Sequence, residues 1–212
     1  MNATAVASVL APDAWLYRGR PQPEPADSGP GAVPRAALFD RDGTLTEDDP
    51  PYNGDPANVR LRPTAREAVD VLRARGIAVG VVSNQSGVGR GLLTRSQVEA
   101  VAGRIEELLG RFDVWVFCPH VPDDGCTCRK PAPGMVLAAA GALGVAPSDV
   151  AVIGDIGADL GAAAAAGATG ILVPTTVTRP EEVAAAGTVA PDLLTAVSAL
   201  LSPRKAAGQV VR

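Results

Sequence analysis

The chain has 212 residues, 47% of them hydrophobic and 20% charged, with a formal net charge of −4 at pH 7. It lacks the basic surplus of nucleic-acid carriers, so we expect no nucleic-acid partner. No apolar run is long enough to cross a bilayer, and no basic segment precedes the short apolar stretch near the N-terminus. Three cysteines, an odd number, do not suggest a secreted disulfide framework. We expect a cytoplasmic protein without a membrane partner, either a monomer or a weak oligomer.

The first 34 residues differ in composition from the rest of the chain. Five prolines between positions 21 and 34 interrupt any periodicity, so we expect residues 1–34 to form a loosely ordered arm. Within it, Trp15, Leu16 and Tyr17 are apolar enough to dock on the body or on a partner. Residues 35–202 are expected to form one domain, and residues 203–212 a C-terminal tail.

From Ala36 onward, short apolar runs alternate with helical patterns. The apolar runs predict strands at residues 36–39, 77–82, 114–117, 150–153 and 171–173. The helical patterns predict helices at residues 64–76, after residue 94, and at residues 135–143, 158–166 and 191–201. Capping boxes are expected at Thr64 with Glu67 and at Thr94 with Gln97. This alternation predicts an α/β fold with a doubly wound, Rossmann-like parallel sheet.

Polar residues follow four of the predicted strands. Asp40, Ser83, Cys118 and Asp155 come after the first, second, third and fourth strand, respectively. In a doubly wound sheet, ligands bind beyond the carboxyl ends of the strands. Four separate loops therefore converge on one edge, where we expect an active site.

Two carboxylates lie close together directly after the first strand, in Asp40-Arg41-Asp42-Gly43-Thr44. Gly43 permits the turn that brings Asp40 and Asp42 into one pocket. Beside a metal, Asp40 stays ionised and acts as a nucleophile, while Asp42, crowded by negative charge, serves as general acid and then base. The alternative is an ordinary Asp-Gly turn with a solvated carboxylate.

The other loops at this edge offer phosphate and metal ligands. Ser83 and the backbone of its Gly-containing loop are suited to hold a phosphoryl oxygen. Lys130 neutralises charge on the nucleophile and phosphoryl group, and Arg129 makes a phosphate contact, unless the two form a solvated basic pair. Asp155 is expected to bind Mg²⁺, with Asp159 beside it, although Asp155 is also a candidate helix cap.

All three cysteines and the only histidine fall within eleven positions. Cys118, His120, Cys126 and Cys128 provide three thiolates and one imidazole, a closed tetrahedral set for Zn²⁺. Four protein ligands leave no open position, so we expect this zinc to be structural. A disulfide would leave one cysteine unpaired, and the cytosol opposes it.

Four motifs in order resemble those of the haloacid dehalogenase (HAD) superfamily of phosphatases. They are Phe39 to Thr44, Ser83, Lys130, and Gly154-Asp155 with Asp159. The resemblance covers about residues 36–201. It implies attack by Asp40 on phosphorus, an aspartyl-phosphate intermediate, and hydrolysis assisted by Asp42. It also implies that Asp40, the backbone carbonyl of Asp42 and Asp155 hold Mg²⁺.

The cysteine-rich loop resembles the histidinol-phosphatase and heptose-bisphosphatase branch, subfamily IIIA. That branch lacks a separate cap domain, and residues 43–63 are too few to form one. The resemblance implies a phosphorylated sugar as substrate, with heptose 1,7-bisphosphate cleaved at the 7-phosphate as the best match. It also implies contacts from Asn84, Gln85, Ser86 and Arg129 to the sugar or its second phosphate. Ile156, where the branch often has Lys, departs from the pattern.

Three other functions remain as alternatives. A histidinol-phosphate phosphatase needs a site for a cationic amine, and Arg129 with Arg90 favours an anionic group instead. The phosphatase part of a polynucleotide end-repair protein shares the motifs, but the net charge opposes it. A zinc-stabilised, non-catalytic binding module has no physical need for mutually repelling acids.

Overall fold

A computed structural model describes residues 14–18 and 33–202 of the chain. Residues 1–13, 19–32 and 203–212 lie outside the described part, which includes most of the predicted arm and the C-terminal tail. Within the described part, no helix is both apolar enough and long enough to cross a bilayer.

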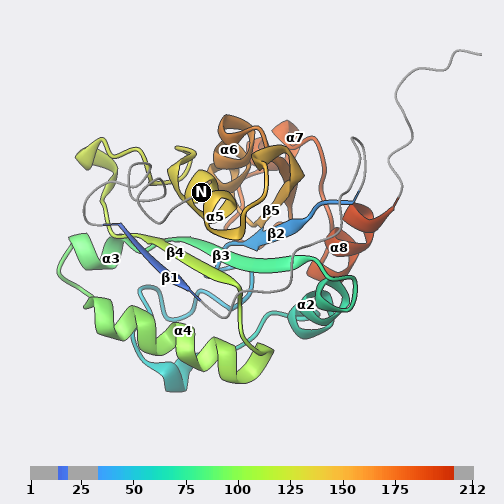
Figure 1. Cartoon of the computed structure of the whole chain (residues 1–212). Coiled ribbons are helices and arrows are strands. Elements are labelled where there is room, and N and C mark those ends of the chain that lie inside the picture. The colour runs from blue at the N-terminus through green and yellow to red at the C-terminus, as the bar shows by residue number, and fades with distance from the viewer. Residues whose placement is uncertain (1–13, 19–32, 203–212) are drawn as a thin grey trace, which may run out of the picture.

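The body of the molecule is a six-stranded sheet in the order β1-β4-β3-β2-β5-β6 (Figure 1). The five strands from β4 to β6 in this order are parallel, and β1 joins the edge at β4 in the antiparallel sense. The strands are β1 (Trp15–Arg18), β2 (Ala36–Phe39), β3 (Ala78–Asn84), β4 (Val114–Cys118), β5 (Val150–Gly154) and β6 (Thr169–Leu172). The predicted doubly wound α/β fold is confirmed, and β2 lies in the middle of the sheet.

Helices cover both faces of the sheet, as Figure 1 shows. Helices α2, α4 and α8 pack on one face, and α5 and α6 pack on the other. The α-helices are α2 (Ala65–Ala74), α3 (Ser86–Gly89), α4 (Arg95–Leu109), α5 (Gly134–Leu143), α6 (Gly157–Ala166), α7 (Pro180–Ala185) and α8 (Leu193–Leu201). Short 3-10 turns occur at Pro56–Asn58, Pro122–Asp124 and Pro147–Asp149. Residues 43–63 hold only the first of these turns, so no cap domain is inserted there.

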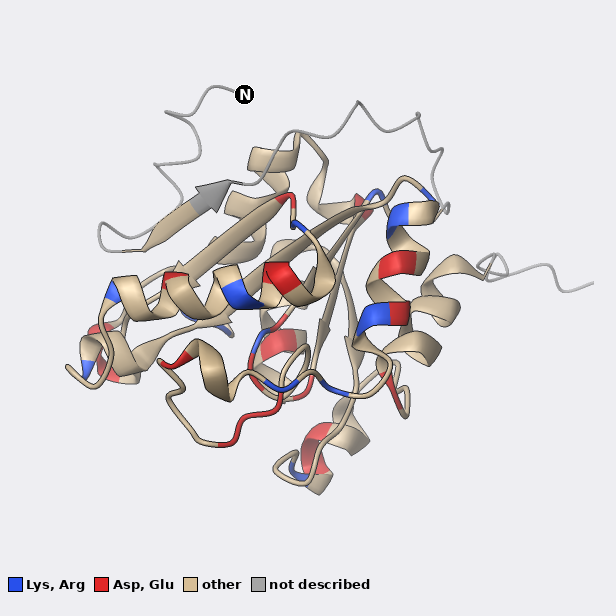
Figure 2. Cartoon of the chain, turned by 90° about the horizontal axis from the view of Figure 1, so that it is seen from below, with Lys and Arg blue, Asp and Glu red and all other residues tan. Residues whose placement is uncertain are grey.

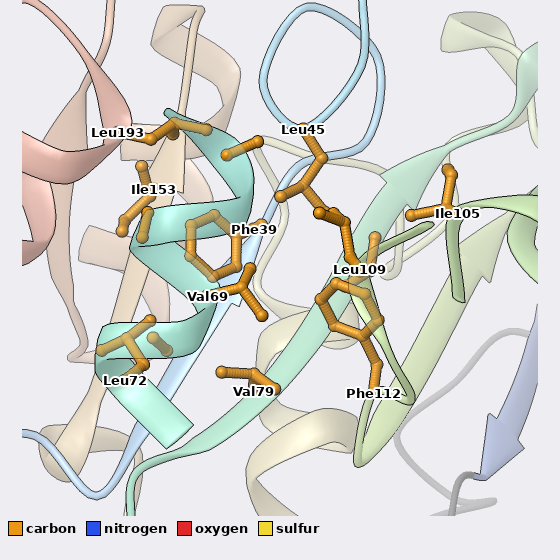
Figure 3. Close-up of a cluster of buried hydrophobic side chains, with 14 of the residues drawn as sticks. Phe39, Leu45, Val69, Leu72, Val79, Ile105, Leu109, Phe112, Ile153 and Leu193 are labelled. Atoms are coloured by element: carbon orange, nitrogen blue, oxygen red, sulfur yellow. The ribbon is translucent and has the colours of Figure 1, made fainter. Parts of the chain in front are cut away.

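Alternate residues of each strand supply the two cores. In β2, Phe39 faces the layer with α2, α4 and α8, and Leu38 faces the layer with α5 and α6. Around Phe39, Figure 3 shows the side chains of Val69, Leu72 and Val79 packed together. The second layer is rich in alanine, because α5 and α6 pack close to the sheet through small side chains.

Most predicted elements are confirmed, and the differences have local reasons. The capping box at Thr94 with Gln97 is present. The one expected at Thr64 is wrong: Thr64 has a left-handed backbone (φ 62°) and its hydroxyl accepts a hydrogen bond from Leu194 N instead. Ser83 lies inside β3 rather than after it, because β3 continues to Asn84.

Strand β1 falls within residues 1–34, which were expected to form a loosely ordered arm. The ring of Trp15 packs 5.2 Å from that of Phe117, and the guanidinium carbon of Arg95 lies 5.0 Å from its centroid. These contacts dock a short part of the arm on the sheet beside β4. The strand was not predicted because it has only four residues and prolines lie on both sides of it.

Figure 2 shows blue and red segments interspersed along the helices on the viewed side of the molecule. Arg95 pairs with Glu99 and Arg104 with Glu107 on α4, each within one helical turn. The charges on this side therefore pair locally rather than forming one basic surface.

We predict that Leu72→Ala lowers the free energy of unfolding by about 2–5 kcal/mol, because it leaves a cavity under α2. Leu72 is fully buried, whereas Leu92 is 58% exposed. The matched substitution Leu92→Ala should change stability by less than about 0.5 kcal/mol. Urea unfolding followed by circular dichroism measures both variants, and equal losses would contradict the described core.

Candidate active site

Asp40 is the first residue after the central strand β2. Its backbone N–H donates to Ile153 O of the neighbouring strand at 2.9 Å, which fixes the carboxylate at the carboxyl edge of the sheet. The residue is 7% exposed. A buried carboxylate in this position needs a compensating positive charge.

Lys130 provides that charge from the loop before α5. Its Nζ lies 2.7 Å from Asp40 Oδ1 and 2.5 Å from Asp159 Oδ1, and it donates to Val82 O at 3.0 Å. Burial lowers the pKa of Lys130, but Asp159 and Asp40 outweigh it, so the pKa is raised above its ordinary value. Lys130 is therefore a fixed cation between two buried acids.

Asp155 approaches Asp40 from the end of β5. Single oxygens of Asp40, Asp155 and Asp159 lie within 4.8 Å of one another, close enough to hold one metal ion. Thr44 Oγ1 donates to Asp155 Oδ1 at 3.2 Å, and Thr178 Oγ1 donates to the Asp155 carbonyl at 2.6 Å. Thr44 thus orients the carboxylate, and Thr178 holds the backbone of the same residue.

Gly43 is required where the first loop passes Asp155. Its φ is 82°, and a Cβ at this position would lie 2.4 Å from Asp155 Oδ2. No L side chain fits this backbone without moving the carboxylate. The turn after Asp42 therefore depends on glycine for both its conformation and its space.

Among the described residues, Lys130 is the one cation that pairs with this group of three acids. Burial raises the pKa of Asp40 well above its ordinary value, Lys130 opposes the shift, and Asp159, Asp155 and Asp42 add to it. Burial and then Asp159 raise the pKa of Asp155 to about 6. A bound divalent cation reverses this tendency and keeps the acids ionised, so the donor set fits Mg²⁺.

Asp42 does not join the group of three acids. Arg41 Nε donates to its two carboxylate oxygens at 2.9 and 3.0 Å, and Gln85 Nε2 donates to Oδ2 at 2.8 Å. Gln85 Nε2 also donates to Ser83 Oγ at 2.8 Å. The predicted general acid and the predicted phosphate-binding hydroxyl are therefore linked by one amide.

The neighbouring amide has a different partner. Asn84 Nδ2 donates to Lys130 O at 3.1 Å, and Lys130 N donates to Asn84 Oδ1 at 3.0 Å. Both amides of the Asn84-Gln85 pair are thus engaged within the protein, and their contacts with a sugar stay predictions. Ser86 begins α3, and its substrate contact likewise stays a prediction.

The cysteines and the histidine converge as predicted. Pairs of sulfurs among Cys118, Cys126 and Cys128 lie 3.2–3.8 Å apart, and His120 Nδ1 lies 3.3 Å from Cys118 Sγ and from Cys128 Sγ. Tetrahedral zinc–thiolate geometry gives about 3.8 Å between sulfurs, whereas a disulfide needs about 2.0 Å. The three cysteines are free, so the cluster fits a metal ion rather than a disulfide.

The cysteine cluster is followed directly by the loop that carries Arg129 and Lys130. Arg129 N donates to Cys126 Sγ at 3.3 Å, and Arg129 Nη1 donates to His120 O at 3.0 Å. This guanidinium nitrogen ties the cysteine loop together, and a phosphate contact by Arg129 stays a prediction. The next residue is Lys130, so the cluster lies directly before the buried cation in the chain.

The comparisons with known proteins agree with this geometry. A family model described as polynucleotide kinase 3 phosphatase matches residues 35–156, and a HAD-hydrolase-like model matches residues 127–197. The chain is 38% identical to the D-glycero-beta-D-manno-heptose-1,7-bisphosphate 7-phosphatase of Pseudomonas aeruginosa over 142 residues, 65% of this chain and 80% of that protein. The chain belongs to the HAD-like phosphatases. The protein of the same name from Bordetella bronchiseptica is 36% identical over 65% of this chain and 79% of its own length.

A solved HAD-like phosphatase has the same fold. The crystal structure of D,D-heptose 1,7-bisphosphate phosphatase from B. bronchiseptica, complexed with magnesium and phosphate, superposes with a TM-score of 0.71 at 31% identity. The match covers 79% of this chain and 98% of that one. The relative thus binds the two species that the acids and Lys130 suggest here.

Sequence reasoning missed the loop after β6. Thr175 Oγ1 donates to Asp155 Oδ2 at 3.5 Å, and Thr178 reaches the Asp155 carbonyl. The rule that ligands gather after parallel strands applies to this loop as well and would have found it. Arg41 was also missed as a partner of Asp42, because its role depends on side-chain direction.

In the metal-free HAD-like phosphatase, we predict that Mg²⁺ raises Tm more at about pH 7.5 than at about pH 5. The pKa of Asp155 is about 6 in the folded protein against an ordinary value of 3.8. Its contribution to stability is therefore full below the ordinary value and is lost as the pH rises through the folded value. Above that pH the ionised acids repel one another, and the cation relieves the repulsion.

Thermal unfolding with and without Mg²⁺ at both pH values tests this prediction. Asp155→Asn removes one of the repelling charges, so in metal-free protein at the higher pH its Tm should exceed that of wild type. The variant should also lose most of the Mg²⁺-dependent increase. Equal Mg²⁺ effects at the two pH values would contradict the assignment.

Proposed function

We propose that the protein is a Mg²⁺-dependent phosphatase that hydrolyses a phosphomonoester of a small sugar bisphosphate. The observation that carries this proposal is the convergence of Asp40, Lys130 and Asp155 at the carboxyl edge of one sheet. The site combines a buried nucleophile, a fixed cation and a place for a metal. Membership of the HAD-like phosphatases supports it.

The proposed reaction begins with attack of an Asp40 oxygen on phosphorus. As the new P–O bond forms, the bond to the leaving oxygen breaks. The leaving oxygen keeps the electron pair of the broken bond and accepts a proton from Asp42. Lys130 offsets the charge gathered around the phosphoryl group, and the Ser83 hydroxyl donates to a phosphoryl oxygen. Asp40 then carries an aspartyl phosphate.

Water completes the cycle. The Asp42 carboxylate accepts a proton from water as the water oxygen attacks phosphorus, and Asp40 leaves as a carboxylate with inorganic phosphate as the product. The three converging acids would hold the metal through Asp40 and Asp155, with the backbone carbonyl of Asp42 as a further ligand. When bound, Mg²⁺ supplies positive charge beside the transferring phosphoryl group. Asp159 faces Lys130 and serves to hold that cation in place.

The substrate we propose is D-glycero-D-manno-heptose 1,7-bisphosphate, cleaved at the 7-phosphate. Two relatives that share more than a third of their aligned residues with the chain carry that activity in their names. A polynucleotide 3′-phosphate is the second candidate, because the end-repair phosphatase model matches residues 35–156. The interspersed charges in Figure 2 favour the small sugar.

We also propose that Cys118, His120, Cys126 and Cys128 hold a structural zinc. Their spacing and free thiols support it. The reduced cysteines support a cytoplasmic location as well. The catalytic domain is proposed to span residues 35–202, and the protein to act as a monomer or weak oligomer.

We predict that wild-type protein with Mg²⁺ releases phosphate from heptose 1,7-bisphosphate with a higher kcat/KM than from histidinol phosphate, fructose 1,6-bisphosphate or a 3′-phosphorylated oligonucleotide. Asp40→Asn should lower kcat by about 10⁴-fold or more, because the amide cannot attack phosphorus. Asp49→Asn is the matched control outside the converging acids and should stay near wild type. No release from any of the four compounds would refute the phosphatase proposal, and retained turnover by Asp40→Asn would refute the nucleophile.

We predict one zinc per chain by metal analysis, and loss of that zinc in Cys126→Ser. Without the metal, the loop that fixes Lys130 loosens, so KM should rise and Tm should fall. A conservative Ser202→Ala change outside the cluster serves as the control for zinc content. Full activity in demonstrably zinc-free protein would contradict the link between the cluster and Lys130.

A further inference from the structure

We infer that Gln85 is a positioning residue for the general acid: it holds Asp42 and Ser83 in place rather than binding substrate. The inference rests on the proposed phosphatase function and assigns a role within that site. Gln85 is 3% exposed, and its amide contacts three functional side chains. A residue buried in this way has little surface left for a sugar.

The partners fix which way the amide points. Arg41 Nη2 donates to Gln85 Oε1 at 3.1 Å, and a guanidinium offers donors only. The amide oxygen must therefore face Arg41. The NH₂ group then faces two acceptors, Asp42 Oδ2 and Ser83 Oγ, each at 2.8 Å. One hydrogen goes to each acceptor, and a flipped amide would lose the bonds to Arg41 and to Asp42.

Ser83 gains a defined direction from the same contact. Because its Oγ accepts from Gln85, the hydroxyl hydrogen has to point elsewhere. The hydroxyl is thereby set as a donor, the role that a phosphoryl oxygen requires.

Asp42 is held from its buried side only. Its side chain is 24% exposed, whereas that of its partner Arg41 is 1% exposed. Arg41 and Gln85 thus anchor a carboxyl group that reaches the opening of the site. From there it can give its proton to a departing oxygen and return to the same two anchors as a carboxylate.

This arrangement predicts that the loss of activity on disturbing Asp42 depends on the leaving group of the substrate. An alkoxide needs the Asp42 proton as the P–O bond breaks, whereas nitrophenolate is stable enough to leave without it. Disturbing Asp42 should therefore slow the hydrolysis of alkyl phosphates far more than that of p-nitrophenyl phosphate. The ratio kcat/KM reports the steps up to loss of the leaving group, so the later role of Asp42 as a base does not enter.

The test compares kcat/KM for a sugar phosphate and for p-nitrophenyl phosphate in the full-length Mg²⁺ enzyme. Gln85→Met, nearly isosteric but without hydrogen bonds, should lose about 10–100-fold on the sugar phosphate and only a few-fold on the aryl ester. Asp42→Asn should show the same asymmetry. Adding Gln85→Met to Asp42→Asn should cost only the few-fold that Gln85→Met costs on the aryl ester, because the rest of its effect acts through Asp42.

Asn84→Leu is the matched control among the amides. Asn84 holds the backbone of Lys130, so its loss should affect both substrates equally. If Gln85→Met does not fold, Gln85→Glu replaces the donor facing Asp42 with an acceptor at similar size and should give the same asymmetry. Equal losses on both substrates for the Gln85 variants would overturn the inference and leave the phosphatase proposal intact. A wild-type enzyme inactive on both substrates would instead refute that proposal.

Discussion

The buried ammonium group of Lys130 is the interaction on which the geometry of the site depends. Lys130 lies between Asp40 and Asp159 with almost no access to water, and a charge in that position is tolerated only because both acids pair with it. Its backbone is held by Asn84, and the cysteine loop precedes it in the chain. Three acids face this one cation, so the pocket retains a negative surplus that a divalent ion balances.

The site divides into two parts that touch through the first loop. Asp40, Asp155 and Lys130 form a buried charged centre, where we propose that the metal and the phosphoryl group bind. Asp42 stands apart, held by Arg41 and Gln85 nearer the solvent. The separation keeps Asp42, the proposed general acid, away from the strongest negative charge. Gly43, the residue after Asp42, lets the loop pass close to the Asp155 carboxylate, in a conformation and a space that only glycine fits.

The sequence predicted the fold class and the convergence of the site, because both follow from strand order and from what stands at strand ends. Asp40 and Asp155 needed no tertiary knowledge beyond that rule, and the cysteine cluster followed from the spacing of its residues in the sequence. The roles of Asn84 and Gln85 were not accessible in this way. The two amides are adjacent in sequence but serve Lys130 and Asp42, respectively. Strand β1 was missed for a related reason, since its stability comes from packing on Phe117 and Arg95.

The place of β2 between β3 and β5 has a consequence for how the chain folds during synthesis. Ala36 pairs with both Ala78 and Val150, so the central strand is flanked by partners that are far away along the chain. Such non-local pairing forms slowly, and a nascent chain lacks one wall of the pocket until residue 155 has been synthesised. An amino-terminal fragment that ends before residue 155 therefore lacks one of the three acids that converge beside Lys130.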